Sequence, residues 1–148
     1  MEAARGRNGG GGGGPPSVVA ITLRATVSPT EDPAKVLAAA RSALGECAYE
    51  VEDGGTEGDG SIVLRSKDGR CLRKVRDQLR DRHVRDAANR LLLRMRDGPR
   101  VTMLLNRQAA TAGVVALCTS ATESPLGPLV LVVESESPEA VIAWLTAH

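Results

Sequence analysis

The amino-acid sequence predicts an α+β fold, in which a mixed or antiparallel sheet carries helices on one face. First, the chain has 148 residues, 42% of them hydrophobic and 25% charged, which suits one domain with a substantial core. Second, stretches with strand and helix periodicity follow one another in the order β-α-β-β-α-α-β-β-β-α. Third, the strands come in groups joined by short loops, which is typical of α+β proteins.

Residues 1–16 precede the predicted domain and read "MEAARGRNGGGGGGPP". Such a segment buries too little apolar surface to offset the entropy lost on ordering it. The glycine run is not a phosphate-binding loop, because no strand precedes it and no Gly-Lys-Ser/Thr sequence follows it. We therefore expect a disordered tail, followed by a single domain over residues 17–148.

The domain is expected to begin with a strand at residues 17–27, "SVVAITLRATV". Its apolar and polar residues alternate, so one side should face the core and the other side solvent. A helix should then begin at Pro33, with Asp32 as its N-cap, and end before Gly45. The buried positions predicted for this helix are Val36, Ala40, Ala43 and Leu44.

Two strands, at residues 47–53 and 60–66, are expected before a long basic helical segment. The apolar positions of that segment change phase by about a third of a turn, at roughly 100° per residue. One straight helix cannot bury both stripes, so we predict a break between residues 81 and 83. The first stripe is Leu72, Val75 and Leu79, and the second is Val84, Ala87, Ala88, Leu91 and Met95.

Three further strands are expected at residues 100–109, 113–120 and 128–136. A final helix should begin at Pro138, with Ser137 as its N-cap. The second face of the sheet is not wholly polar, because Leu104, Leu117 and Val130 are expected on it. We interpret this face either as partly covered or as a surface for self-association into a homodimer.

The cysteines indicate the cellular compartment. A disulfide framework or a zinc site would need paired or clustered thiols, and Cys47, Cys71 and Cys118 are far apart and form no CxxC pair. We therefore expect all three to be buried and reduced, as in a cytoplasmic protein. Apolar runs such as "LVLVV" at residues 129–133 are far shorter than a membrane span, and the N-terminus lacks the apolar core of a signal peptide. A membrane partner is not expected.

Residues that could carry catalysis are scarce. The two histidines, His83 and His148, have neither metal-ligand spacing nor a nucleophile beside them. The chain also contains two pairs of carboxylates, Glu31 with Asp32 and Glu134 with Glu136. Either pair could hold Mg²⁺ for a nuclease, but helix capping explains the first and an exposed strand end the second. We expect no enzyme activity, metal or cofactor, with a metal-dependent nuclease as the alternative.

Positive charge is concentrated in the middle of the chain. Residues 65–107 contain 14 basic and five acidic residues, a net charge of +9, whereas the rest of the chain carries −8. This asymmetry implies an acidic partner. Arginine outnumbers lysine in the segment, and its planar fork suits bidentate contact with phosphate. The alternative is a solvated helix face stabilised by i,i+4 pairs with aspartates.

The predicted ligand is structured or duplex RNA, with DNA as the alternative. Modules that read single-stranded RNA stack bases on aromatic rings, and Tyr49 and Trp144 are the only aromatics here. A cationic helix face would instead contact the phosphate backbone. The predicted RNA-binding residues are Arg73, Lys74, Arg76, Arg80, Arg82, Arg85, Asn89, Arg96, Arg100 and Arg107. Four of them are expected to form one row opposite the apolar stripe of the second helix: Arg82, Arg85, Asn89 and Arg96.

Five segments carry a family resemblance: "SPTEDPAKV" (28–36), "LRDRHVRDAANRLLLR" (79–94), "LLNRQAA" (104–110), "ESPLGPL" (123–129) and "SPEAVIAWL" (137–145). In this order they resemble the archaeal uncharacterised protein family numbered 0201. The resemblance covers residues 17–148 and implies an archaeal, cytoplasmic, non-enzymatic RNA-binding protein associated with the exosome. It also implies a fold like that of the large-subunit ribosomal protein that holds 5S rRNA. Ser28 departs from the family pattern, because an aromatic residue is expected there.

A second function of another class is consistent with the same sequence. The chain could serve as a protein-interaction module of an RNA-processing assembly such as the archaeal exosome. The second face of the sheet or the acidic C-terminal helix would then be the contact surface.

Overall fold

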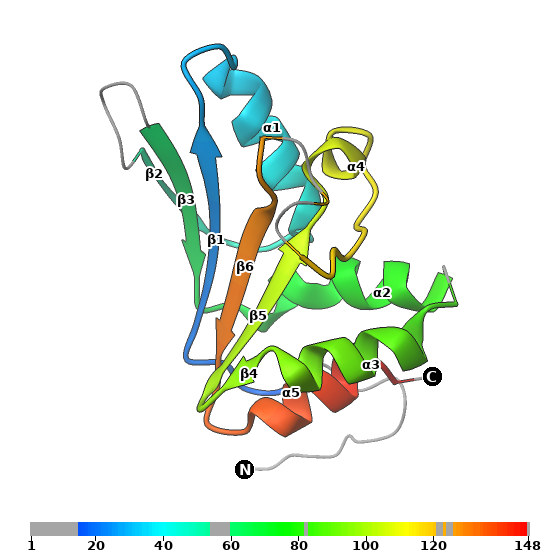
Figure 1. Cartoon of the computed structure of the whole chain (residues 1–148). Helices are drawn as coiled ribbons and strands as arrows, with labels where there is room; N and C mark the ends of the chain where they lie inside the picture. Colours follow the sequence, from blue (N-terminus) through cyan, green and yellow to red (C-terminus); the bar gives the residue numbers. More distant parts are fainter. Residues whose placement is uncertain (1–14, 54–59, 82, 121–122, 124–125, 148) are drawn as a thin grey trace.

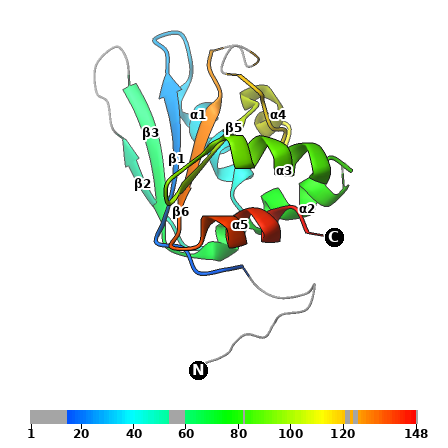
Figure 2. The same cartoon turned by 60° about the horizontal axis from the view of Figure 1, so that its bottom comes forward.

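An antiparallel sheet forms one layer of the protein and helices form the other (Figures 1 and 2). The computed structural model describes residues 15–53, 60–81, 83–120, 123 and 126–147. The disordered tail expected at residues 1–16 therefore lies, except for its two prolines, outside the described residues. The α+β prediction is confirmed, with a sheet in which every pair of neighbouring strands is antiparallel.

The sheet has six strands in the order β2-β3-β1-β6-β5-β4. Their bounds are β1 Ala20–Val27, β2 Glu50–Asp53, β3 Gly60–Ser66, β4 Arg96–Asp97, β5 Arg100–Leu105 and β6 Leu129–Glu134. The strand predicted at residues 47–53 is thus shorter than expected, because pairing with β3 begins only at Glu50. β1 lies inside the sheet and pairs with both β3 and β6, so the first strand of the chain is flanked by two strands that come later in the sequence.

All helices of the described chain lie on the same side of the sheet (Figure 2). Their bounds are α1 Pro33–Ala43, η2 Gly69–Leu72 (a 3-10 helix), α2 Arg73–Asp81, α3 Arg85–Arg94, α4 Arg107–Thr111 and α5 Pro138–Leu145. α1 packs on β1 and α4, whereas α2 and α3 both pack on α5. None of the described helices is long and apolar enough to cross a membrane.

The core between the two layers is aliphatic. Alternate residues of β1, β5 and β6 are buried against the helices, as the period of two requires. On the opposite face Leu104 and Val130 are direct cross-strand neighbours and are half-buried, as predicted. The prediction was wrong for Leu117, which lies opposite the buried Leu105 in an isolated bridge and so points toward the helix layer.

The local signals for the first helix and for the broken basic segment are confirmed. The Asp32 side chain accepts the backbone N–H of Ala34 at 3.0 Å, which caps α1 with Pro33 at its first position. α2 ends at Asp81, and the residues between α2 and α3 include His83 with a φ of 57°, a left-handed conformation that ends a helix. The buried residues of α1 are those predicted, with Ala39 in addition.

The apolar stripe predicted for α3 is only partly buried. Ala88 and Leu92 face the core, whereas Val84 is 36% exposed, Ala87 is exposed and Leu91 is half-buried. Because the helix is interrupted before α3, the orientation of α3 about its axis is not fixed by that of α2. The line of residues next to the predicted stripe therefore faces the core. Sequence periodicity finds the apolar residues of a helix, but it does not fix which edge of the stripe is covered.

The C-terminal half differs from prediction in two places. Residues 107–111 form α4 rather than the end of a strand, because the Asn106 side chain accepts the N–H of Ala109 at 2.9 Å and caps a helix there. Residues 113–120 form no strand of the sheet and make only the single bridge at Leu117. α5 begins at Pro138 as predicted, but the side chain of Ser137 makes no capping bond.

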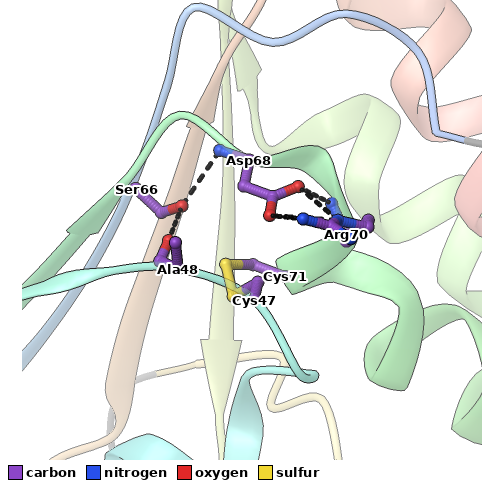
Figure 3. Close-up of a disulfide and its surroundings, with 6 residues drawn as sticks. All are labelled: Cys47, Ala48, Ser66, Asp68, Arg70 and Cys71. Carbon is purple, nitrogen blue, oxygen red and sulfur yellow. Dashed lines mark hydrogen bonds and ion pairs between the residues drawn. A yellow bond between two sulfur atoms is a disulfide. The ribbon is translucent and has the colours of Figure 1, made fainter.

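The prediction of three reduced thiols is wrong for two of the cysteines. Cys47 and Cys71 form a disulfide with a Cα–Cα distance of 5.2 Å (Figure 3), whereas Cys118 is free and buried. The two cysteines are 24 residues apart, and the β2–β3 hairpin brings the chain back so that they meet. The spacing of the cysteines in the sequence does not predict this disulfide, because the contact depends on how the strands between the two cysteines pair.

Candidate nucleic-acid interface

The basic segment forms two neighbouring helices, α2 and α3, at the side of the molecule that also carries α5 (Figure 1). On these helices the side chains of Arg73, Arg80, Arg90 and Arg94 belong to exposed residues, and Arg85 is half-buried. Arg80 makes an i,i+3 contact of 3.6 Å with Asp77 of its own helix. Among the described residues, none of these five arginines forms an ion pair with another element. Their guanidinium groups are therefore available to an anionic ligand.

Two other cations of α2 hold the helix in place. The Nε of Arg76 donates to the backbone oxygen of Trp144 at 2.9 Å, and its guanidinium lies 5.2 Å from the centre of the indole ring. The Nζ of Lys74 donates to the backbone oxygen of Ser42 in α1. α2 is thus fixed between α1 and α5 by these two side chains, which points to a structural role for both.

The residues predicted further along the segment also contact other elements. Asn89 donates to the hydroxyl of Thr146 at 3.0 Å, just beyond α5. Arg96 lies in β4 and pairs with Glu139 of α5 at 2.8 Å, which is an exposed contact. The predicted row of Arg82, Arg85, Asn89 and Arg96 is therefore not found, because its last member lies in a strand and Asn89 faces α5. Arg82 lies outside the described residues.

Arg100 lies at the start of β5, between β4 and β6, rather than on the helices. Its Nε is 3.8 Å from a carboxylate oxygen of Glu134, its direct cross-strand neighbour, and its side chain is 65% exposed. Glu134, one of the carboxylates considered above as a possible Mg²⁺ ligand of a nuclease, therefore lies beside an arginine. Arg100 thus belongs to a different surface from the arginines of α2 and α3.

Arg107 is buried, with its side chain only 5% exposed. It pairs with Glu31 at 3.0 Å and donates to the backbone oxygens of Thr26 at 2.8 Å and Gly127 at 3.0 Å. Glu31 also accepts the backbone N–H of Ser28 at 2.9 Å. The guanidinium and the carboxylate are thus both enclosed in a structural cluster, which joins β1, the start of α1, α4 and the turn before β6.

The side chains in the described part of the chain do not assemble a metal centre. No group of three or more histidine, cysteine, aspartate or glutamate residues is found there. Burial raises the pKa of the Cys118 thiol, and the nearby carboxylate of Glu123 raises it further. A thiol with a raised pKa is a poor nucleophile near neutral pH. The surface that stands out chemically is the one formed by the arginines.

The chain matches a family model described as RNA binding over residues 20–134. It is 35% identical over 127 residues to a UPF0201 protein of Sulfurisphaera tokodaii, covering 85% of this chain and 86% of that protein. The chain belongs to the UPF0201 family. A further member, from Sulfolobus acidocaldarius, is 32% identical over 126 residues and covers 85% of this chain and 86% of its own length. RNA binding is thereby supported at the level of the UPF0201 family.

Solved structures of UPF0201 proteins share the fold. The protein from Methanococcus jannaschii superposes with a TM-score of 0.71 at 20% identity, covering 87% of this chain and all of that one. A second UPF0201 structure superposes with a TM-score of 0.64 at 29% identity, over 80% of this chain and 84% of the other.

Three of the segments that resemble the UPF0201 family meet around Arg107. Glu31 comes from "SPTEDPAKV", Arg107 from "LLNRQAA" and Gly127 from "ESPLGPL". Arg107 was predicted to bind RNA from its charge alone, because its contact with Glu31 depends on the folded chain. Arg90 and Arg94 were not among the predicted RNA-binding residues. The signal for both was their i,i+4 spacing on an exposed helix edge.

Proposed function

We propose that this protein binds structured or duplex RNA through phosphate contacts made by the arginines of α2 and α3, and that it does so without catalysis. The observation that carries the proposal is the set of five arginines, Arg73, Arg80, Arg85, Arg90 and Arg94, which have no ion pair to another element among the described residues. Guanidinium groups that are not held by another element of the fold can displace counterions from phosphates. The family-level match to an RNA-binding model supports RNA as the polyanion.

The two aromatic rings support a backbone-reading mode. Trp144 lies under the guanidinium of Arg76, and Tyr49 is half-buried and packs against the core. Neither ring belongs to a row of exposed aromatic residues of the kind that stacks successive bases. Contacts to phosphates and to the shape of a duplex do not need such a row. In this proposal the protein acts in the cytoplasm, as the resemblance to the UPF0201 family implies, and its fold is related to that of the ribosomal protein that holds 5S rRNA.

The proposal is tested by removing two exposed arginines of α2 that form no ion pair with another element among the described residues. The double variant Arg73→Ala with Arg80→Ala should bind duplex RNA more weakly, to a similar degree for different sequences. Each lost phosphate contact should flatten the log–log salt dependence of binding by about 0.7–0.9. Fluorescence anisotropy at several salt concentrations measures both quantities.

The matched control removes two positive charges from α1. Lys35→Ala with Arg41→Ala changes the net charge equally, and both positions are exposed. This control should keep the wild-type salt slope. Wild-type affinity and slope in the α2 variant would refute the proposal and favour the second candidate, a protein-interaction module of an RNA-processing assembly such as the archaeal exosome. Cleavage of the RNA in the presence of Mg²⁺ would refute the non-catalytic part.

A further inference from the structure

A groove of about 680 Å³ lies between α3 and the extended residues 115–119. Its walls are mostly aliphatic: Ala87 and Leu91 come from α3, Val84 is the residue just before α3, and Leu117 comes from the facing segment. Val84, Ala87 and Leu91 belong to the stripe that periodicity assigns to the core, yet Val84 and Ala87 are exposed and Leu91 is half-buried. Part of the apolar face of α3 is therefore left uncovered by the described chain.

The segment opposite α3 has an unused backbone edge at the groove. Cys118 donates its N–H to Leu104 at 2.7 Å, and Ala116 accepts the N–H of Asn106 at 2.8 Å, so both residues pair with the end of β5. In an antiparallel pair, the residue between two such bonds points its own N–H and C=O away from the partner strand. That residue is Leu117, whose backbone groups have no hydrogen-bond partner among the described residues.

The neighbouring outward-pointing amides are already bonded. Val115 donates to the side-chain oxygen of Gln78 at 2.7 Å, and Thr119 donates to the carboxylate of Glu123 at 3.1 Å. Of the three outward-pointing N–H groups, that of Leu117 is thus the one left open among the described residues, beside the aliphatic walls of the groove. An unpaired strand edge next to apolar walls is the arrangement that binds extended peptides by strand addition.

The α3 side of the groove rim is positively charged. Arg90 and Arg94 line it from α3, and both are exposed and have no ion pair among the described residues. A ligand with carboxylates beside its apolar residues would complement this rim. RNA fits the walls poorly, because aliphatic side chains offer bases neither a ring to stack on nor partners for their polar edges.

We propose that this groove binds an extended segment of a partner protein, with aliphatic residues at alternate positions and acidic residues at its ends. The segment pairs with the N–H and C=O of Leu117, its aliphatic side chains enter between Leu91 and Leu117, and its carboxylates contact Arg90 and Arg94. The groove has a volume within the usual range of roughly 300–1,000 Å³ for binding pockets. The groove shares Arg90 and Arg94 with the proposed RNA-binding set, but it does not include Arg73 and Arg80 of α2, on which the RNA experiment rests.

The probe is a short fluorescein-labelled peptide with leucine at alternate positions, threonine between them and glutamates at both ends. It should bind the full chain saturably, and Ala87→Asp should weaken binding at least about tenfold by placing a charge on the groove wall. Ala87 is exposed near the start of α3, where a carboxylate is tolerated, so the variant should fold. The matched control is Ala38→Asp, at an exposed alanine of α1, which should bind the peptide like the wild type.

Two further measurements test the mode of binding. Hydrogen exchange at the amide of Leu117 should slow when the peptide is added, and a peptide whose glutamates are replaced by lysines should bind at least about tenfold more weakly. No binding of the peptide, equal binding by Ala87→Asp, or an unprotected Leu117 amide would overturn the proposal. Failure here is distinguishable from failure of RNA binding, because Arg73→Ala with Arg80→Ala should weaken RNA binding and leave peptide affinity unchanged. Loss of RNA binding in Ala87→Asp, with no peptide binding, would assign the groove to RNA.

Discussion

The cluster around Arg107 and the surface of α2 and α3 use the same side chain in opposite ways. Arg107 is enclosed, and its guanidinium is already bonded to Glu31, Thr26 and Gly127. Arg73, on α2, is exposed and forms no ion pair among the described residues. Both count equally toward the charge of the basic segment. The difference teaches that the number of arginines in a segment does not measure its capacity to bind a polyanion.

Between these extremes lie side chains that join helices at the surface. Arg76 and Asn89 each connect a basic helix to α5 or the residue after it, and Lys74 connects α2 to α1. Such contacts explain part of the positive charge without a ligand. What remains for a ligand is decided by which guanidinium groups are left without partners in the folded chain, and this is a property of tertiary structure.

The largest expected effect comes from breaking the buried pair. Arg107→Met should lower the free energy of unfolding by about 3–5 kcal/mol, because it leaves the carboxylate of Glu31, only 12% exposed, without its partner. Urea denaturation followed by circular dichroism measures the loss. The matched control Arg90→Met, at an exposed position of α3, should change the free energy by less than about 0.5 kcal/mol. Similar losses in the two variants would contradict the division between structural and available arginines.

The second effect concerns the disulfide at the base of α2. Replacing both Cys47 and Cys71 by serine should lower the free energy of unfolding by about 3 kcal/mol, because the cross-link restricts the unfolded chain. Thiol titration gives an independent check. The denatured protein should show one reactive thiol, from Cys118, before reduction and three afterwards. Three reactive thiols before reduction would restore the expectation drawn from spacing alone.

Sequence reasoning succeeded where the determining interactions are local. The capped start of α1 at Asp32 and the helix break before His83 depend on residues close to them in the sequence, and both were predicted. The short helix α4 was missed because a single cap at Asn106 outweighs a weak alternation of apolar residues. Residues 113–120 were predicted to form a strand because their apolar pattern fits one, although only Leu117 makes a bridge.

The site was harder to predict than the fold, for the same physical reason. Arg76 and Trp144 are 68 positions apart in the sequence, and Arg107 and Glu31 are 76 positions apart. No periodicity or spacing in the sequence connects such pairs, so the RNA-binding residues could be predicted only from their charge. The excess of positive charge in residues 65–107 was visible from the sequence, but its division between structural contacts and a free surface was not.

The smallest effect comes from an ion pair like that of Arg107 but located at the surface. Asp68 caps η2 by accepting the backbone N–H of Arg70 at 2.9 Å, and it pairs with the Arg70 guanidinium, which belongs to a side chain that is 65% exposed (Figure 3). The side-chain hydrogen bond from Arg70 lowers the pKa of Asp68 below its usual range. A group whose pKa is lower in the folded state stabilises the fold above its unfolded pKa, which is about 3.9 for aspartate. That contribution is lost as the pH falls through the folded value.

Asp68→Asn isolates this ionic contribution, because asparagine can still cap η2 through its side-chain oxygen but carries no charge. The variant should be slightly less stable than the wild type at neutral pH, by much less than Arg107→Met. The difference should shrink as the pH falls below about 4 and should also shrink in high salt, since an exposed pair is screened. Urea unfolding of both proteins across this pH range measures it. A stability difference that is as large as that of Arg107→Met, or that persists unchanged at the lowest pH, would show that burial is not what separates the two arginines.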